Sequence, residues 1–128
     1  MEKNKVIIYA DRHMAETKVT AILKNRCEVR EKKLNAADYV LSKEVACERK
    51  TGNDFLQSLI DGRLFAQVNE LKGRYKNPIL LIEGEIDLEN RNIHPNAVRG
   101  ALAAITIDLG MPVFWTKNQL ETAETLFT

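Results

Sequence analysis

The sequence predicts an α/β domain with a mixed central sheet. Short runs of β-branched and aromatic residues alternate with stretches whose apolar residues recur at helical spacing, which indicates alternating strands and helices. One pair of apolar runs flanks a tight turn instead, which predicts an antiparallel hairpin and makes the sheet mixed. No repeat, low-complexity stretch or linker divides the 128 residues, and this length suits one core. We therefore expect residues 1–128 to form a single domain.

The first half of the chain is expected to contribute most of the strands. An apolar run at 6–9 predicts a buried strand, and residues 15–25 predict a helix. Residues 27–33 alternate only weakly, as an exposed strand does. The hairpin comes next, with arms at 39–42 and 45–47 and a two-residue turn at Lys43-Glu44.

Two helices are expected after the hairpin. Thr51 is the expected N-cap of the first helix, with Asp54 where a capping box usually has Glu or Gln. Gly62 ends this helix, and the apolar residues between Leu64 and Leu71 begin the second one.

The last part of the chain follows the clearest buried strand, which Pro78 introduces and which spans 79–82. An acidic loop at 83–92 leads to a helix that runs from Pro95 to about Asp108 and ends at Gly110. The final elements are a strand at 113–115, whose Phe114 and Trp115 we expect in the core, and a helix at 118–127.

Composition excludes several classes of protein. Apolar residues make up 45% and charged residues 29%, which is typical of a folded domain rather than a disordered chain. No apolar run approaches the roughly 20 residues of a membrane span. Residues 1–5 lead directly into a strand pattern, so we expect no signal peptide. The two cysteines form neither a disulfide framework nor a zinc motif, which favours a reduced cytoplasmic, nucleoid or nuclear protein that is not secreted.

Charge is distributed unevenly along the chain. Residues 1–76 carry 16 basic and 11 acidic side chains, whereas residues 77–128 carry three basic and seven acidic ones. A basic first part suits a polyanionic partner, because cations that neutralise phosphates release counterions. An ordinary solvated surface remains the alternative.

The predicted hairpin brings together the candidate catalytic residues. Glu48 and Lys50 are two residues apart on one arm and therefore share a face, whereas Arg49 points the other way. Asp38 opens the other arm and can lie beside Glu48. Two carboxylates can hold Mg²⁺ or Mn²⁺, which suits phosphodiester hydrolysis with Lys50 orienting water or stabilising the transition state. On spacing alone, a cross-strand salt bridge explains the same residues.

The same segment resembles a known nuclease signature. Ala37-Asp38-Tyr39, followed by Glu48-Arg49-Lys50 and the later Asp54, is similar to the G-D-x(n)-E-R-K-x(3)-D signature of the XPF/Hef family of structure-specific nucleases. The resemblance continues through residues 57–65, Gln67, 78–84 and 94–101, and so covers essentially the whole chain.

This resemblance implies a restriction-endonuclease-like fold with a metal-dependent site of the PD-(D/E)xK type. It implies that Asp38 and Glu48 are metal ligands, that Lys50 is the catalytic base or electrostatic stabiliser, and that Arg49 is part of the catalytic motif. Asp54 matches the trailing acid and supports the site or caps the next helix. Arg63 and Gln67, one helical turn apart, border the site in the resemblance, or form a solvated helix face.

Three departures from the family pattern affect these expectations. Ala37 replaces the Gly before Asp38, and no helicase or helix-hairpin-helix domain accompanies the nuclease domain. The family's first-strand D-x-R-E motif aligns poorly: with Arg12 matched, the second acid becomes His13, and a shifted register restores Asp11 but misplaces Arg12. Asp11 and His13 are therefore only candidate supporting residues.

The resemblance implies a function in DNA repair or in processing stalled forks. A metal-dependent endonuclease would cut forked, flapped or nicked branched DNA near the junction. The alternatives are an inactive DNA-binding partner subunit of the same family and a different nuclease of the same fold. The family also implies a homodimer, and small and apolar residues on the C-terminal helices (Ala97, Gly100, Ala101, Ala104, Leu120, Ala123, Leu126, Phe127) suggest that these helices pair.

Overall fold

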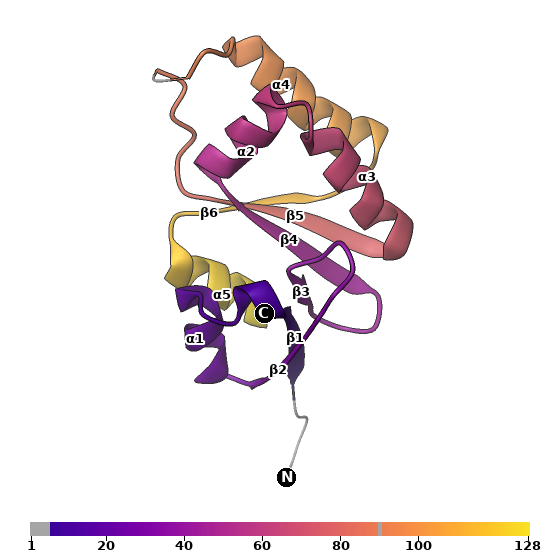
Figure 1. The fold of residues 1–128 in the computed structure, drawn as a ribbon, viewed down its shortest axis with the longest axis vertical. Coiled ribbons are helices and arrows are strands. Elements are labelled where there is room, and N and C mark those ends of the chain that lie inside the picture. Colours follow the sequence, from indigo (N-terminus) through magenta and orange to yellow (C-terminus); the bar gives the residue numbers. More distant parts are fainter. Residues whose placement is uncertain (1–5, 90) are drawn as a thin grey trace.

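The computed structural model describes residues 6–89 and 91–128, so the segment at 1–5 lies outside the described part. One six-stranded sheet runs through the domain in the order β2-β1-β3-β4-β5-β6 (Figure 1). The elements are β1 (Ile7–Asp11), α1 (Lys18–Lys24), β2 (Glu28–Lys32), β3 (Tyr39–Val40), β4 (Val45–Thr51), α2 (Gly52–Ile60), α3 (Leu64–Arg74), β5 (Asn77–Glu83), α4 (Pro95–Ala103), β6 (Val113–Thr116) and α5 (Gln119–Phe127).

The sheet is mixed, as the sequence predicts. β3 pairs antiparallel with both β1 and β4, whereas the β1–β2, β4–β5 and β5–β6 pairs are parallel. The Leu41 N–H donates to the Val45 carbonyl at 2.8 Å, which leaves three residues in the turn of the hairpin. The predicted two-residue turn is therefore one residue too short. The β3–β4 register of Tyr39 with Cys47 places Asp38 opposite Glu48.

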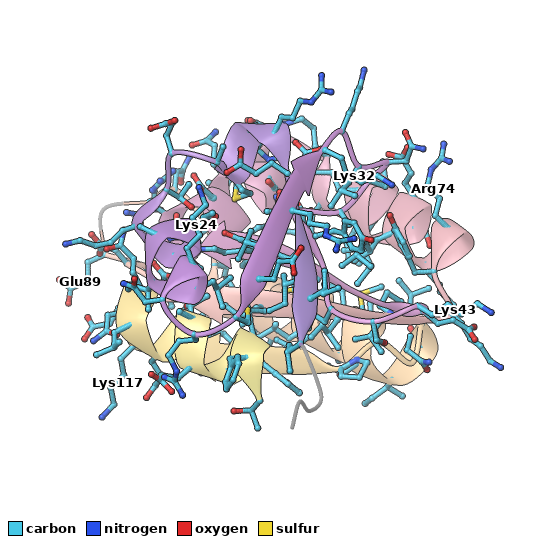
Figure 2. All side chains as sticks on the ribbon, turned by 90° about the horizontal axis from the view of Figure 1, so that it is seen from below. Lys24, Lys32, Lys43, Arg74, Glu89 and Lys117 are labelled. Atoms are coloured by element: carbon cyan, nitrogen blue, oxygen red, sulfur yellow. The ribbon has the colours of Figure 1, made fainter. Side chains whose placement is uncertain are left out.

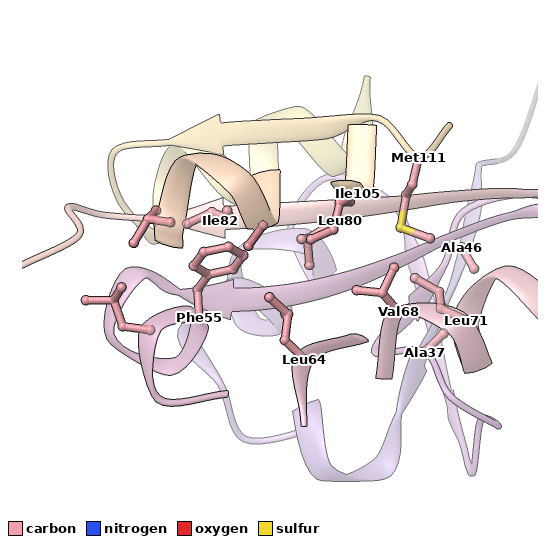
Figure 3. Close-up of a cluster of buried hydrophobic side chains, with 13 residues drawn as sticks. Ala37, Ala46, Phe55, Leu64, Val68, Leu71, Leu80, Ile82, Ile105 and Met111 are labelled. Atoms are coloured by element: carbon pink, nitrogen blue, oxygen red, sulfur yellow. The ribbon is translucent and has the colours of Figure 1, made fainter. Parts of the chain in front are cut away.

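Helices cover the sheet in two layers. α2, α3 and α4 lie above the sheet in the view of Figure 1, and α1 and α5 lie below it. The upper layer encloses the larger core cluster, which includes Phe55, Leu64 and Ile82 (Figure 3). The lower layer encloses a second cluster, in which Leu23 and Leu126 pack against the other face of the sheet. Fully buried apolar side chains on both faces are the main stabilising contribution to such a fold.

Local signals in the sequence explain the ends of several helices. Thr51 Oγ1 accepts from the Asp54 N–H at 3.1 Å, so Thr51 is the N-cap of α2, as predicted. His94 Nδ1 accepts from the Asn96 N–H at 3.0 Å and caps α4, whose first residue is Pro95. Gly62, which follows α2, has a φ of +75°, a conformation that glycine adopts without steric cost.

The structure corrects the predictions for the C-terminal half. The helix that begins at Pro95 is regular only to Ala103 and continues as a π-helical segment over Ala104–Asp108. Phe114 and Trp115 are 44% and 50% exposed rather than buried. β6 is an edge strand with one neighbour, so less of its surface is covered than that of a central strand.

The predicted helix-pairing surface is also partly wrong. Ala101, Ala123 and Leu126 are buried within the domain's own core, because α4 packs above the sheet and α5 packs against α1. Ala97 and Gly100 remain exposed. No helix in the described ranges is long and apolar enough to cross a bilayer.

Candidate active site

The predicted hairpin residues converge beside two adjoining hollows. Asp38, Glu48 and His13 line both of them. The first hollow, of about 330 Å³, continues towards Asp11 and Gln67. The second, of about 270 Å³, continues towards a set that includes Lys50, Asp54, Ser58 and Arg63. Candidate residues from β1, the hairpin, α2 and the start of α3 thus border one continuous site.

Asp38 is at the centre of the site and is only 3% exposed. The backbone N–H of Arg49 donates to Asp38 Oδ2 at 2.8 Å, and His13 Nε2 lies 2.8 Å from Asp38 Oδ1. Burial raises the pKa of Asp38, and these two contacts offset only part of that effect. The antiparallel hairpin therefore holds a carboxylate in a place that disfavours an isolated negative charge.

Glu48 lies beside Asp38 because the hairpin register pairs their positions. Burial, followed by the nearby Asp38 carboxylate, raises the pKa of Glu48 to about 8. Two carboxyl groups that resist simultaneous ionisation are a typical binding site for a cation, whose positive charge removes their repulsion.

Lys50 lies on the same side of β4 as Glu48, as the alternation along a strand predicts. Its Nζ lies 3.9 Å from Glu48 Oε2 and donates to Ser58 Oγ at 3.3 Å. Ser58 comes from α2, so the helix that follows the hairpin fixes the position of the amine. Sequence reasoning missed Ser58, although a polar residue between the apolar positions Phe55 and Leu59 could have indicated it.

Asp11 and His13 both belong to the site. Asp11 Oδ1 accepts from the Leu34 N–H at 2.6 Å, and its Oδ2 accepts from the His13 backbone N–H at 3.1 Å and contacts His13 Nδ1. These donated hydrogen bonds lower the pKa of Asp11 although burial opposes them. His13 thus connects Asp11 to Asp38, and the two acidic groups raise its pKa against the opposing effect of burial.

Arg49 points to the opposite face of β4 and pairs with Glu83 on the neighbouring β5. Its Nε and Nη2 lie 2.9 and 2.7 Å from the two Glu83 carboxylate oxygens, and both side chains are largely buried. Thr122 Oγ1, from α5, also donates to Glu83 at 2.6 Å. Arg49 therefore ties the hairpin to β5 and α5 and not to α2, because alternation along β4 directs it away from that helix.

The other supporting candidates lie at the edges of the hollows. Asp54 borders the second hollow next to the N-cap of α2, and Arg63 borders the same hollow while paired with Asp61 at 3.2 Å. Gln67 borders the first hollow, and its Oε1 is buried without a hydrogen-bond partner among the described residues. An unpartnered buried oxygen next to a carboxylate pair fits a site that takes a bound water or a cation.

The donor set fits a hard divalent cation. Within the described ranges, no three His, Cys, Asp or Glu side chains converge closely enough to enclose an ion. Mg²⁺ does not require such a cage, because it commonly keeps several waters and uses one or two carboxylates. Asp38 and Glu48 are the two carboxylates of this site that could act as such ligands.

Comparisons with known proteins identify the family. The sequence profile of the ERCC4 domain matches residues 10–128. This chain belongs to the ERCC4 domain family.

Relatives of this ERCC4 domain include endonucleases and a helicase. It is 38% identical over 121 residues to the 3′-flap repair endonuclease Xpf of Saccharolobus solfataricus, covering 93% of this chain and 52% of that protein. It is 42% identical over 111 residues to a Methanocaldococcus jannaschii protein named as an ATP-dependent RNA helicase, covering 87% of this chain and 14% of that protein. The domain thus spans about half or less of these relatives.

A solved structure confirms the fold of the ERCC4 domain. XPF from Aeropyrum pernix, in a complex with DNA, superimposes with a TM-score of 0.90 at 30% identity, covering 95% of this chain and 62% of that one. The predicted restriction-endonuclease-like fold with a mixed sheet is therefore confirmed, as is the resemblance to XPF and Hef-like proteins.

Proposed function

We propose that this ERCC4 domain is a divalent-metal-dependent endonuclease that cuts branched DNA near the junction. The observation that carries the proposal is the convergence of Asp38, Glu48 and Lys50 beside one hollow. The family membership and the resemblance to repair endonucleases support it. The names of the relatives also favour a role in DNA repair, and with it a location at the nucleoid or in a nucleus.

In this proposal Asp38 and Glu48 hold Mg²⁺ or Mn²⁺. When bound, the cation lowers the pKa of a coordinated water and neutralises charge that develops at phosphorus. Lys50, held in place by Ser58, orients the attacking water or stabilises the additional negative charge of the phosphoryl group. Asp11 and His13 keep Asp38 in its orientation, and Gln67 Oε1 offers a further acceptor to water.

Cleavage assays with defined DNA substrates test the proposal. We expect labelled fork, flap and nicked substrates to be cut near the branch in Mg²⁺ or Mn²⁺, and linear duplex to stay intact. A chelator should stop the reaction reversibly. Asp38→Asn and Glu48→Gln should reduce the rate by at least about 100-fold while fork binding stays within about twofold.

Each alternative predicts a different result. An inactive partner subunit would bind forks and cut nothing, and His13 in place of an expected acid is the observation that favours it. A restriction-type nuclease would cut linear duplex at preferred sequences. Near-wild-type rates for either carboxylate variant would show that the site is assigned wrongly.

The proposed partners include a second copy of the chain. The exposed large apolar residues of the C-terminal half lie on the edge strand β6 (Phe114, Trp115) and on the segments before and after it (Ile107, Leu120). Burying them between two copies would recover hydrophobic free energy, and a two-fold contact is the usual geometry. The partial coverage of relatives also fits a domain that functions within a longer protein containing helicase or helix-hairpin-helix domains.

A further inference from the structure

A larger hollow lies next to the candidate active site, on the β1–β3 part of the sheet. Its volume is about 610 Å³, within the range of ligand sites. Leu34 borders both this hollow and the first active-site hollow, so the two are neighbours. Its lining includes Ile7, Tyr9, Lys32, Leu34, Lys43 and Tyr75. We refer to it below as the tyrosine hollow.

The strand β1 connects the tyrosine hollow to the site. Ile7, Tyr9 and Asp11 alternate along β1 and therefore point to one face of the sheet. Tyr9 is two residues from Asp11, a distance of about 7 Å along a strand. A polymer whose reacting group lies near Asp38 can therefore extend along β1 and reach Tyr9.

The charge of the tyrosine hollow suits a polyanion. Lys32 and Lys43 border it, and no acidic residue is among its lining. Neither lysine has an ion pair with another described residue, and Lys33 provides a third such cation at the adjoining hollow. Lys32 and Lys43 project on the right of Figure 2, whereas Lys24 and Lys117 project on the left.

Two aromatic side chains provide surfaces for stacking. Lys32 Nζ lies 5.3 Å from the centroid of the Tyr9 ring and covers one face of it, so a base that stacks on this face displaces the amine. The Tyr75 hydroxyl donates to the Asn35 carbonyl at 3.1 Å, which fixes the second ring at the end of α3. Partly exposed rings between unpaired lysines are the features that single-stranded nucleic acids recognise, because bases stack on the rings and phosphates contact the lysines.

We propose that the tyrosine hollow binds the single-stranded arm of a DNA substrate as it leaves the active site. This inference rests on the proposed nuclease function. Duplex DNA keeps its bases stacked inside the helix and offers only phosphates to the lysines, so the aromatic rings contribute only to single-stranded binding.

Fluorescence anisotropy with labelled oligo-dT of about 12 nucleotides, in EDTA, tests the inference without cleavage. Tyr75→Leu should weaken binding about fivefold or more, whereas Tyr75→Phe should weaken it by less than about twofold, because the ring face remains although its bond to Asn35 is lost. The same contrast is expected for Tyr9→Leu and Tyr9→Phe. Thermal melting of each variant confirms that it is folded.

The lysines are tested by the salt dependence of the same binding. Lys32→Gln with Lys43→Gln should reduce the slope of log Kd against log salt by about 1.4, since each single-strand phosphate contact contributes about 0.7. As a control, Lys117→Gln removes a charge from the other side of the molecule (Figure 2) and should leave the slope unchanged.

The outcomes separate this inference from the proposed function. Folded Leu variants that bind oligo-dT like the Phe variants would overturn it, as would equal weakening of oligo-dT and linear duplex. Cleavage of a nicked duplex in Mg²⁺ reports on the nuclease proposal alone. If the protein does not cut DNA but its oligo-dT binding depends on the two rings, the proposal for the tyrosine hollow stands and the nuclease proposal fails.

Discussion

Glu48 and Asp38 are neighbouring carboxyl groups in an environment that disfavours their negatively charged forms. Both lie in a partly dry hollow. Burial raises the pKa of each, and the neighbouring Asp38 carboxylate raises that of Glu48 further. Such a pair costs stability when no cation is bound. We infer that the site is maintained for chemistry rather than for the stability of the fold.

The pH dependence of stability tests this interpretation of Glu48. Its pKa is about 8 in the folded protein and near 4.5 when unfolded, so the folded state binds the extra proton between these values. A raised pKa stabilises the fold at low pH, and this contribution disappears as the pH rises towards and past 8.

Without metal, we compare the melting temperatures of Glu48→Gln and wild type. The difference, variant minus wild type, should increase by about 5 °C or more between pH 5 and pH 9. Saturating Mg²⁺ should reduce this difference by stabilising the wild type alone. A constant difference across the pH range would contradict the assigned environment of Glu48.

At the scale of the element, β4 carries candidate site residues on one face of the sheet and a buried ion-pair residue on the other. Glu48 and Lys50 face the site, and Arg49 between them contacts Glu83 on β5, which in turn accepts from Thr122 on α5. The pKa of Glu83 is held below its usual value by the bonds from Arg49 and Thr122, although burial opposes this. On its other face, β4 is therefore held to the helical layer that contains α5.

Arg49→Ala should destabilise the fold by roughly 3–5 kcal/mol, because it leaves the Glu83 carboxylate buried without its partner. Combining Arg49→Met with Glu83→Leu should recover much of this loss, as hydrophobic replacements of buried pairs often do. Denaturant unfolding measures both effects. Cleavage by the double variant distinguishes the roles, since recovery of activity indicates positioning and continued loss at restored stability indicates direct contact with phosphate.

Gly52 fixes the approach of α2 to the loop after β5. A Cβ at this position would lie 2.1 Å from the carbonyl oxygen of Glu85, which no side chain can accommodate without backbone movement. Gly52→Ala should therefore destabilise the domain by about 1–3 kcal/mol. Gly73→Ala is the matched control, because a Cβ there meets no atom within 4 Å and should be neutral or stabilising by up to about 1 kcal/mol. Equal melting temperatures for the two variants would contradict this account.

At the scale of the whole molecule, four of the seven exposed large apolar residues in the described ranges lie on or beside the edge strand β6. Trp115 and Phe114 lie on the edge strand β6, and Ile107 before it is 77% exposed. Exposed patches of this kind commonly mark contacts with another protein. The exposed patch replaces the helix stripe that the sequence suggested, because Ala123 and Leu126 are already buried in the domain.

We expect the wild-type protein to sediment as a dimer at micromolar concentration, with an interface of roughly 1,200 Å² or more. Trp115→Glu should shift it to monomer by placing a charge in that interface. Ile60→Glu should leave the dimer intact, because Ile60 is 43% exposed but lies on α2, above the sheet. A monomeric wild type, or a dimer that tolerates Trp115→Glu, would contradict the proposed contact.

Features that depend on neighbouring residues were predicted well from the sequence. Alternation along 48–50 separates Arg49 from Glu48 and Lys50, and the hairpin places Asp38 opposite Glu48. The cap at Thr51 follows from side-chain chemistry close to the helix end. Local geometry was sufficient in these cases because the interacting groups are joined by only a few bonds of chain or by one tight turn.

Contacts between distant segments were not predictable in the same way. Glu83 is 34 residues from Arg49, and its role required the parallel β4–β5 register that places the two strands side by side. His13 reaches Asp38 only because β1 pairs with β3, and Trp115 is exposed because β6 has a single neighbour.

The sequence by itself determined the class of fold, the metal-binding carboxylate pair that we propose and the resemblance to a nuclease family. Only the tertiary structure decided which charges meet behind the site, which apolar residues remain exposed and where the tyrosine hollow lies. The physical reason is that hydrogen bonds and ion pairs act over a few ångströms. Their partners are therefore selected by the order and register of strands, which a one-dimensional pattern of apolar and polar residues does not specify.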